Sequence, residues 1–238
     1  MTFSPAALRF FRQLATHNDK QWFEAQRTVY EEHVRQPMRE LIEELDARLA
    51  HFAPEIGGDP KRSMFRINRD TRFSKDKSPY KTNAGCWFNH RAASRRVGSE
   101  AAEGSAGFYF HLQPGKSFVG AGVWMPPRPL LEKLRDSIAD DHRPFVRAVK
   151  SLPKRFGGLD DAHVLTRMPR GYAPEHPAAE WLRYQSFVSG RQLTDAQVTS
   201  AKLPGLLARE FEETLPLVRW INGALGWPVV SRARPSTA

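Results

Sequence analysis

Cysteine is almost absent from this chain of 238 residues, because Cys86 is the only one. One cysteine cannot form a disulfide within the chain, and such a composition is typical of proteins in a reducing compartment. We therefore expect a cytoplasmic protein whose fold is held together by its hydrophobic core. Cys86 lies next to Trp87 in an apolar segment, which predicts a buried, unreactive thiol rather than a nucleophile.

Long hydrophobic runs are missing as well. The longest apolar stretch, residues 118–125, is much shorter than the roughly 20 residues that a helix needs to cross a bilayer. Residues 1–20 contain Arg9 and Arg12 in an amphipathic pattern without a continuous hydrophobic region, so we expect neither a secretory signal nor a membrane partner. The hydrophobic content of 40% is nevertheless enough for one substantial core.

The usual signatures of metal and cofactor sites are also lacking. Gly115, Lys116 and Ser117 resemble the end of a phosphate-binding P-loop, but Phe110 occupies the place of its first glycine. The chain has no paired-cysteine zinc motif, no His-Glu-x-x-His helix and no Gly-x-Ser-x-Gly elbow. We therefore predict no metal site and no cofactor.

The order of the predicted elements indicates an α+β fold. Apolar residues recur at helical spacing in residues 5–15, 18–36, 38–52, 128–150 and 204–225, with breaks or bends expected at Pro37 and Pro216. Alternating residues predict short strands at 63–68, 85–89, 108–112, 117–124 and 185–188. Helices first, a central and mostly antiparallel sheet, and helices last are typical of this class. We expect a single domain over residues 1–230 and a flexible tail at 231–238.

Two glycines stand on one face of the predicted strand 117–124. Gly120 and Gly122 weaken that strand unless a helix, a bulky side chain or a ligand packs over them.

Positive charge is concentrated in one region. Residues 61–96 contain eleven lysines and arginines against Asp70 and Asp76, a local charge of +9 in a protein whose formal net charge is +10. Such a focus predicts a discrete basic patch that binds anions. The alternatives are a solvated basic loop and an ion-pair network that pins the loop to the sheet.

Within this region, residues 66–81 combine the groups that phosphate sites use. Guanidinium groups bind oxyanions through two parallel hydrogen bonds, lysines add compact charge, and hydroxyls donate further bonds. The predicted ligand-binding residues are Arg66, Arg69, Arg72, Ser74, Lys75, Lys77, Tyr80 and Lys81, with Arg170 and Tyr172 of a second turn as another wall. Candidates for acid–base chemistry are His111, which titrates near neutral pH, and Asp70. A structural role is the alternative for His111.

Four stretches of the sequence together resemble one known family. They are residues 18–23 (NDKQWF), 67–82 (INRDTRFSKDKSPYKT), 108–115 (FYFHLQPG) and 168–172 (MPRGY), the last with His176 and Pro177. The combination resembles an uncharacterised bacterial and fungal family, domain of unknown function family 2461, over roughly residues 3–226. The resemblance implies one domain, and it implies no particular activity.

Three hypotheses about function follow from these patterns. The first is a protein that binds a phosphorylated or other anionic ligand between residues 66–81, His111 and residues 170–172, either as a binding protein or as an enzyme of unknown reaction. The second is a non-catalytic nucleic-acid-binding module in which Phe73, Tyr80 or Trp87 stacks on bases. The third is a structural motif without a ligand. The sequence does not predict the oligomeric state.

Overall fold

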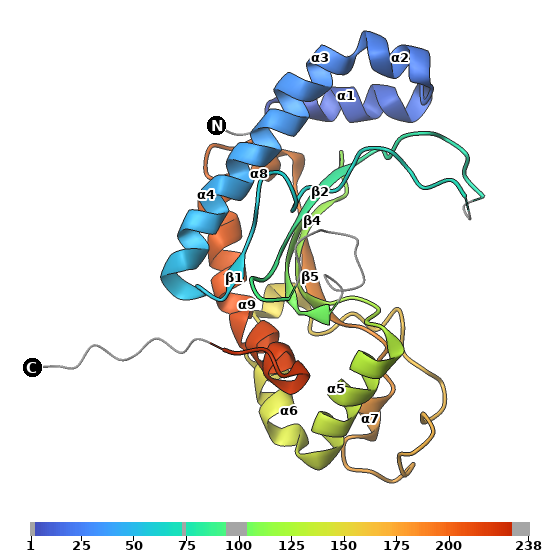
Figure 1. Cartoon of the computed structure of the whole chain (residues 1–238), viewed down its shortest axis with the longest axis vertical. Coiled ribbons are helices and arrows are strands. Elements are labelled where there is room, and N and C mark those ends of the chain that lie inside the picture. The colour runs from blue at the N-terminus through green and yellow to red at the C-terminus, as the bar shows by residue number, and fades with distance from the viewer. Residues whose placement is uncertain (1–2, 73–74, 94–103, 230–238) are drawn as a thin grey trace, which may run out of the picture.

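The fold is built around a five-stranded sheet in which every neighbouring pair of strands is antiparallel (Figure 1). The structure is a computed structural model, and it describes residues 3–72, 75–93 and 104–229. The spatial order of the strands follows the chain: β1 (Ile56–Gly57), β2 (Ala84–His90), β3 (Gly107–Leu112), β4 (Ser117–Val123) and β5 (Phe187–Leu193). With helices before and after the sheet, the predicted single-domain α+β fold is confirmed.

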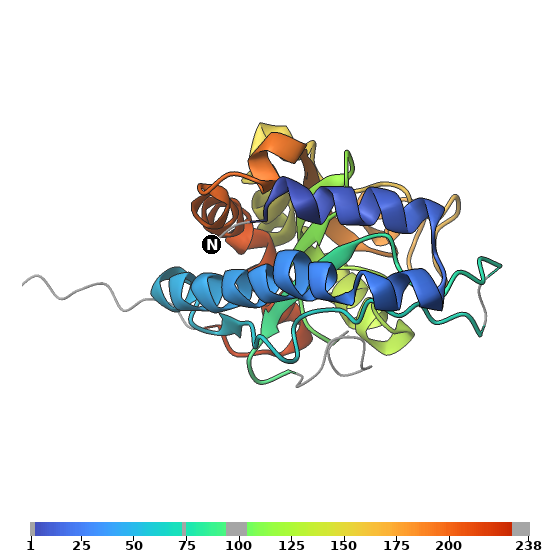
Figure 2. The same cartoon turned by 90° about the horizontal axis from the view of Figure 1, so that it is seen from above.

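The N-terminal helices form an arm that folds back on itself. They are α1 (Pro5–Thr16), α2 (Lys20–Ala25), α3 (Arg27–Tyr30), the π-helical turn η1 (Glu31–Arg35) and α4 (Gln36–Phe52). The last three run on without a break, and α1 packs against α3 and η1 (Figure 2). The helix therefore does not end at Pro37. The break or bend predicted at this proline is instead a π turn, which directly precedes α4.

The C-terminal helices are α5 (Arg128–Asp140), α6 (His142–Lys150), the 3₁₀ turn η3 (Lys154–Phe156), α7 (Ala179–Leu182), α8 (Asp195–Val198) and α9 (Leu203–Leu225). Thr194 caps α8 with a complete capping box, since its hydroxyl accepts from Gln197 N while the Gln197 side chain accepts from Thr194 N. Pro216 lies inside α9, which remains one helix from end to end.

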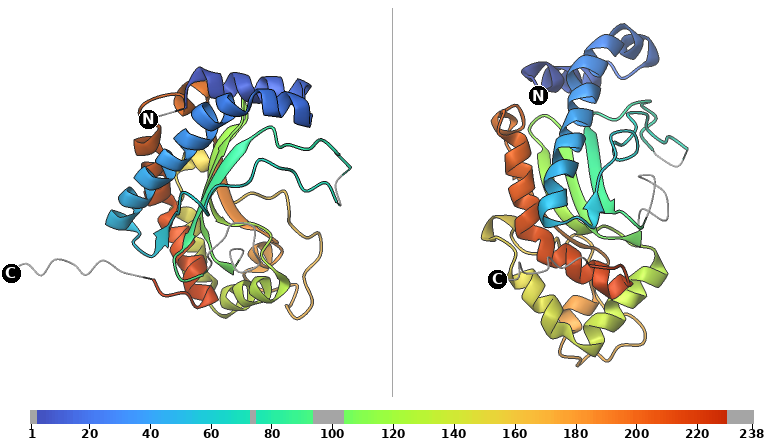
Figure 3. Two further views of the ribbon diagram at one scale, coloured as in Figure 1. Left: turned by 45° about the horizontal axis from the view of Figure 1, so that its top comes forward. Right: turned by 60° about the vertical axis from the view of Figure 1, so that its left-hand side comes forward.

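Helices α4 and α9 lie on the same side of the sheet (Figure 3). The apolar strand residues on that side are buried, and the Phe211 ring of α9 stacks on Phe108 with a centroid distance of 4.5 Å. We call this side the covered face. The opposite side, the open face, carries the half-buried rings of Trp87, Tyr109 and Phe118.

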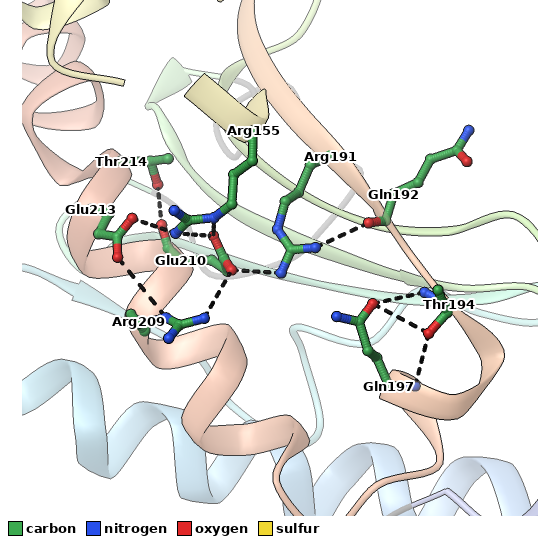
Figure 4. Close-up of polar contacts among 9 residues, drawn as sticks. All are labelled: Arg155, Arg191, Gln192, Thr194, Gln197, Arg209, Glu210, Glu213 and Thr214. Carbon is green, nitrogen blue, oxygen red and sulfur yellow. Dashed lines mark hydrogen bonds and ion pairs between the residues drawn. The ribbon is translucent and has the colours of Figure 1, made fainter. Parts of the chain in front are cut away.

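A buried carboxylate fastens α9 to the covered face. The Glu210 side chain has no exposed surface, and it accepts hydrogen bonds from Arg191 of β5 at 2.6 Å and from Arg155 of η3 at 2.8 Å (Figure 4). Arg155 also pairs with Glu213, which is partly exposed. Because both arginines come from outside α9, this ion-pair cluster joins the helix to the sheet edge.

Two predicted strands differ from the structure. Residues 63–68 form no regular strand, because they meet β2 at one isolated bridge, Met64 with Cys86, and then turn away. The strand predicted at 185–188 starts at Phe187 and runs on to Leu193. The predicted tail at 231–238 lies outside the described residues. Within the described ranges, no helix has the length and apolar character that crossing a bilayer requires.

Candidate functional site

A cavity of about 960 Å³ lies between the N-terminal arm and the segment that links β1 to β2. We call it the basic cavity, because most of the charged side chains that line it are positive. The described acidic residues among them are Glu24 and Glu31, and the basic ones are Lys20, Arg27, Arg35, Arg39, Lys61, Arg62, Arg66 and Lys81.

The helical wall of the basic cavity comes from α2, α3, η1 and α4. Arg27, Glu31, Arg35 and Arg39 recur every four residues, a spacing that keeps side chains on one side of a helix. Both acids of the cavity are used within this wall: Glu24 pairs with Arg27 at 2.5 Å, and Glu31 pairs with Arg35 at 2.8 Å. They therefore neutralise two of the eight positive charges.

The opposite wall is a short irregular ribbon formed by residues 64–69 and 79–81. Lys81 N donates to Ile67 O at 2.8 Å, and Arg69 N donates to Pro79 O at 2.9 Å. These bonds hold Arg66 and Lys81 on strands of chain that run side by side, so both line the cavity.

Asn18 ties the ribbon to the helical arm. Its Oδ1 accepts from Tyr80 N and its Nδ2 donates to Tyr80 O, both at 3.0 Å, across 62 residues of sequence. The Tyr80 ring is buried and stacks on Phe23 at a centroid distance of 4.0 Å. The N-cap of α2 is Asp19, whose side chain accepts from Trp22 N, so the Asn18 side chain is left to bind Tyr80. The motifs at 18–23 and 67–82 are thus two parts of one structure.

Much of the positive charge in the basic cavity lacks a counter-charge. Within the described chain, no carboxylate lies within 4 Å of the cationic groups of Lys20, Arg39, Lys61, Arg62, Arg66 or Lys81. Lys81 is half-buried, and its ammonium lies 5.6 Å from the centre of the Phe65 ring. Burial, followed by repulsion from Arg66 and Arg69, lowers the pKa of Lys81 below its ordinary value.

Three basic residues next to the ribbon, Arg69, Arg72 and Lys77, bind partners within residues 69–77. The Arg72 guanidinium binds both oxygens of Asp70, and Arg69 pairs with Asp76 at 3.1 Å. Hydrogen bonds from the Arg72 side chain and backbone hold the pKa of Asp70 well below its usual range. Lys77 donates to Thr71 O. None of Arg72, Lys75 and Lys77 lines the basic cavity, and Ser74 lies outside the described residues.

His111 lies on the open face of the sheet and does not line the basic cavity. Its Nδ1 is 3.0 Å from the Tyr109 hydroxyl and its Nε2 is 3.0 Å from Gln113 Oε1, while its ring stacks on Phe118. Burial lowers the pKa of His111, and the bond to Gln113 opposes this in part. Both ring nitrogens therefore have partners within the fold.

The second predicted wall lies elsewhere. The Tyr172 hydroxyl donates to Asp136 of α5 at 2.7 Å, and neither Arg170 nor Tyr172 lines the basic cavity. The structure thus brings Arg66, Tyr80 and Lys81 together and leaves His111, Arg170 and Tyr172 apart from them. The predicted site residues omit six cations of the cavity: Lys61 and Arg62, which belong to the basic region 61–96, and Lys20, Arg27, Arg35 and Arg39 of the arm. The four-residue repeat from Arg27 to Arg39 is the signal that could have revealed three of them.

Metal-binding geometry is not found in the described ranges, where no group of three or more His, Cys, Asp or Glu side chains could hold an ion. Cys86 is buried and free, and burial raises the pKa of its thiol.

Asn18 offers a direct test of how the cavity wall is held. Asn18→Ala should lower the free energy of unfolding by about 1–3 kcal/mol, because the Tyr80 backbone N–H and C=O lose their partners in a partly buried position. Chemical denaturation of wild type and variant measures this difference. Thr28→Ala, on the exposed side of the arm, is the control and should change it by less than about 0.5 kcal/mol. Equal effects of the two substitutions would contradict the assignment.

Among the comparisons with known proteins, one gives a match. No curated protein and no protein of solved structure matches the chain. The family model described as conserved hypothetical protein (DUF2461) matches residues 6–220. That range includes both walls of the basic cavity and nearly the whole fold. The chain therefore belongs to this family, the domain of unknown function that its sequence motifs resemble.

Proposed function

We propose that the basic cavity binds a small anionic ligand that carries a phosphate group. The observation that carries this proposal is the set of six cationic side chains that line one cavity with no carboxylate within 4 Å of them in the described chain. Like charges held close together repel one another, and a phosphate between them would relieve that repulsion through charge-assisted hydrogen bonds.

The size and the donors of the cavity support the same ligand class. A volume of about 960 Å³ is at the upper end of the range of about 300–1,000 Å³ for small-molecule sites. Arg39 and Arg66 present planar guanidinium groups from opposite walls, and Lys81 adds a compact charge on the same wall as Arg66. A cytoplasmic location, which the single cysteine predicts, is compatible with a phosphorylated metabolite as ligand.

Substitution of the cavity cations tests the proposal. Calorimetric titration with inorganic phosphate and with pyrophosphate should give a dissociation constant about tenfold to a hundredfold weaker for Arg66→Ala and for Lys81→Ala than for wild type. Each variant loses one charge-assisted hydrogen bond, worth about 1.5–3 kcal/mol. Bound phosphate should also raise the pKa of Lys81 towards its ordinary value, because it stabilises the charged ammonium.

Arg170→Ala is the matched control, since Arg170 is exposed and lies outside the cavity. It should bind phosphate as wild type does. If Arg170→Ala weakens binding as much as Arg66→Ala, the site is not the basic cavity. If no variant differs from wild type while single-stranded DNA binds with a steep salt dependence, the ligand is a nucleic acid and the proposal fails.

A further inference from the structure

The open face of the sheet holds a second cavity, of about 830 Å³. Among the described residues, Phe65 is the one that lines both cavities. The second cavity is also lined by the large side chains of Trp87, Tyr109, Phe118, Trp124, Met125 and Phe156. We call it the aromatic cavity.

Four glycines on adjacent strands form the floor of the aromatic cavity. Gly107 of β3 faces Gly122 of β4, and Gly120 of β4 faces Gly190 of β5 in the strand register. Gly120 also lies opposite Tyr109, which in turn lies opposite Trp87. Two rings are therefore followed, along one cross-strand row, by two positions without side chains, and this leaves a flat area of bare backbone beside the aromatic walls.

The fold requires glycine at some positions of this floor but not at Gly120. A Cβ atom at Gly122 would lie 2.0 Å from Phe187 O, and one at Gly107 would lie 2.0 Å from Phe88 O and 2.5 Å from the Trp87 indole nitrogen. Glycine is required at both positions because backbone or a ring already occupies the space. A Cβ at Gly120 would meet one atom, Ser189 O, at an ordinary 3.4 Å, and its φ is not positive.

Gly120 is thus a glycine that the fold does not need. Glycine weakens a strand, no described side chain packs within 4 Å of its missing Cβ, and a larger residue there would fill the floor of the cavity. Glycine at position 120 therefore keeps the space above the strand open to a ligand.

The rim of the aromatic cavity carries two further irregularities. Trp124 directly follows β4 and is 59% exposed. Met125 is the one non-glycine residue of the described chain with positive φ, at 43°, and its backbone N–H is held by Ser186 Oγ at 2.9 Å. Strained backbone of this kind concentrates at ligand-binding positions, and here it turns the chain at the edge of the cavity.

The charges around the aromatic cavity nearly cancel. Lys116 and Asp160 line it with opposite signs, and the Arg191 guanidinium is turned to the covered face, where it binds Glu210. A strongly charged ligand would find no matching set of counter-charges. The lining instead suits an uncharged molecule, since buried aromatic surface with few polar groups is typical of such sites.

From the bare floor, the aromatic walls and the balanced charge, we infer that the aromatic cavity is a second ligand site that takes a flat, uncharged aromatic molecule, lying on Gly120 and Gly190 beside Phe118 and Trp124. This inference does not depend on phosphate binding in the basic cavity.

Titration with prodan, a flat and uncharged naphthalene dye whose emission reports an apolar environment, tests the inference. Wild type should bind it saturably at one site. Gly120→Val should bind at least tenfold more weakly, because its side chain would occupy the floor. Trp124→Ala removes an exposed wall without disturbing the core, and it should also weaken binding about tenfold. Circular dichroism checks that both variants fold.

Gly205→Val is the matched control, because a Cβ at Gly205 on the surface of α9 meets nothing within 4 Å. It should bind the dye as wild type does. Equal affinity of wild type, Trp124→Ala and a folded Gly120→Val would overturn the site. Displacement of the dye by the compact cage alcohol 1-adamantanol as readily as by quinoline would overturn the preference for flat rings. Competition by inorganic phosphate would show that the two cavities are one site, which also contradicts the inference.

Discussion

Glu210→Ala is expected to lower the free energy of unfolding by about 3–5 kcal/mol, since removing one partner of a buried ion pair leaves the other charge uncompensated. The Glu210 carboxylate is fully buried, and the side chain of its partner Arg191 is only 13% exposed. In the variant, the Arg191 guanidinium would remain beneath α9 without the acceptor that now holds it at 2.6 Å. Urea denaturation followed by circular dichroism measures the difference.

Glu213→Ala is the control for this prediction. Glu213 shares Arg155 with Glu210 but is 37% exposed, so the loss of its ion pair should change the free energy of unfolding by no more than about 1 kcal/mol. Losses of similar size in the two variants would mean that burial is not what makes Glu210 important.

The same residue predicts how stability depends on pH. Burial alone would raise the pKa of Glu210, but hydrogen bonds from Arg191 and Arg155 outweigh it and hold the pKa below the ordinary 4.5. The native carboxylate thus binds a proton less readily than the unfolded one, and its contribution is present above about pH 4.5. That contribution is lost as the pH falls through the native pKa. The acid-side slope of stability against pH should therefore be shallower in Glu210→Ala than in wild type.

Gly122→Ala is expected to lower the free energy of unfolding by at least about 3 kcal/mol, or to prevent folding altogether. Gly122 has a φ angle of 120°, which residues with a side chain rarely adopt, and an added Cβ would lie 2.0 Å from Phe187 O. Neither strain can be relieved without separating β4 from β5, where Gly122 faces Val188. Thermal unfolding and the yield of soluble protein report the outcome.

Gly120→Ala, two residues earlier on the same strand, is the control for the Gly122→Ala prediction. Its added Cβ meets ordinary space, so its free energy of unfolding should stay within about 1 kcal/mol of the wild-type value. A large loss in both variants would show that neither position of β4 tolerates a side chain, and it would remove the distinction between the two glycines.

The parts of the fold that the sequence predicted correctly are those with a local signal. The helix at Gln36–Phe52 follows from apolar spacing, and the strands β3 and β4 follow from alternating residues. Residues 63–68 alternate as a strand does, yet they bridge β2 only at Met64. Alternation of apolar and polar residues indicates which side chains are buried. Whether the segment pairs with a neighbouring strand depends on where the tertiary fold places that strand.

The candidate site shows the same limit more sharply. The charge count located Arg66 and Lys81, but Arg35 and Arg39 lie on a separate helix, in a region of the sequence that is acidic overall. Their approach to Lys81 results from tertiary packing, including the bonds of Asn18 to Tyr80. Composition also could not show that the Arg72 guanidinium binds Asp70 instead of lining the cavity.

The π turn at Glu31–Arg35 makes the length of the helical arm as important as its composition. Such a turn holds one residue more than the α-helix around it, and each residue of an α-helix turns the chain by about 100°. Deleting one residue there would leave a regular helix and keep the arm in nearly the same rotation relative to α4, whereas deleting one of residues 36–38 would rotate the arm by that angle relative to the rest of α4. Asn18 would then turn away from Tyr80, and Arg27 would leave the cavity that Arg39 still lines. The cavity should therefore survive the loss of one residue from the π turn, but not the loss of one residue from the α-helix directly after it.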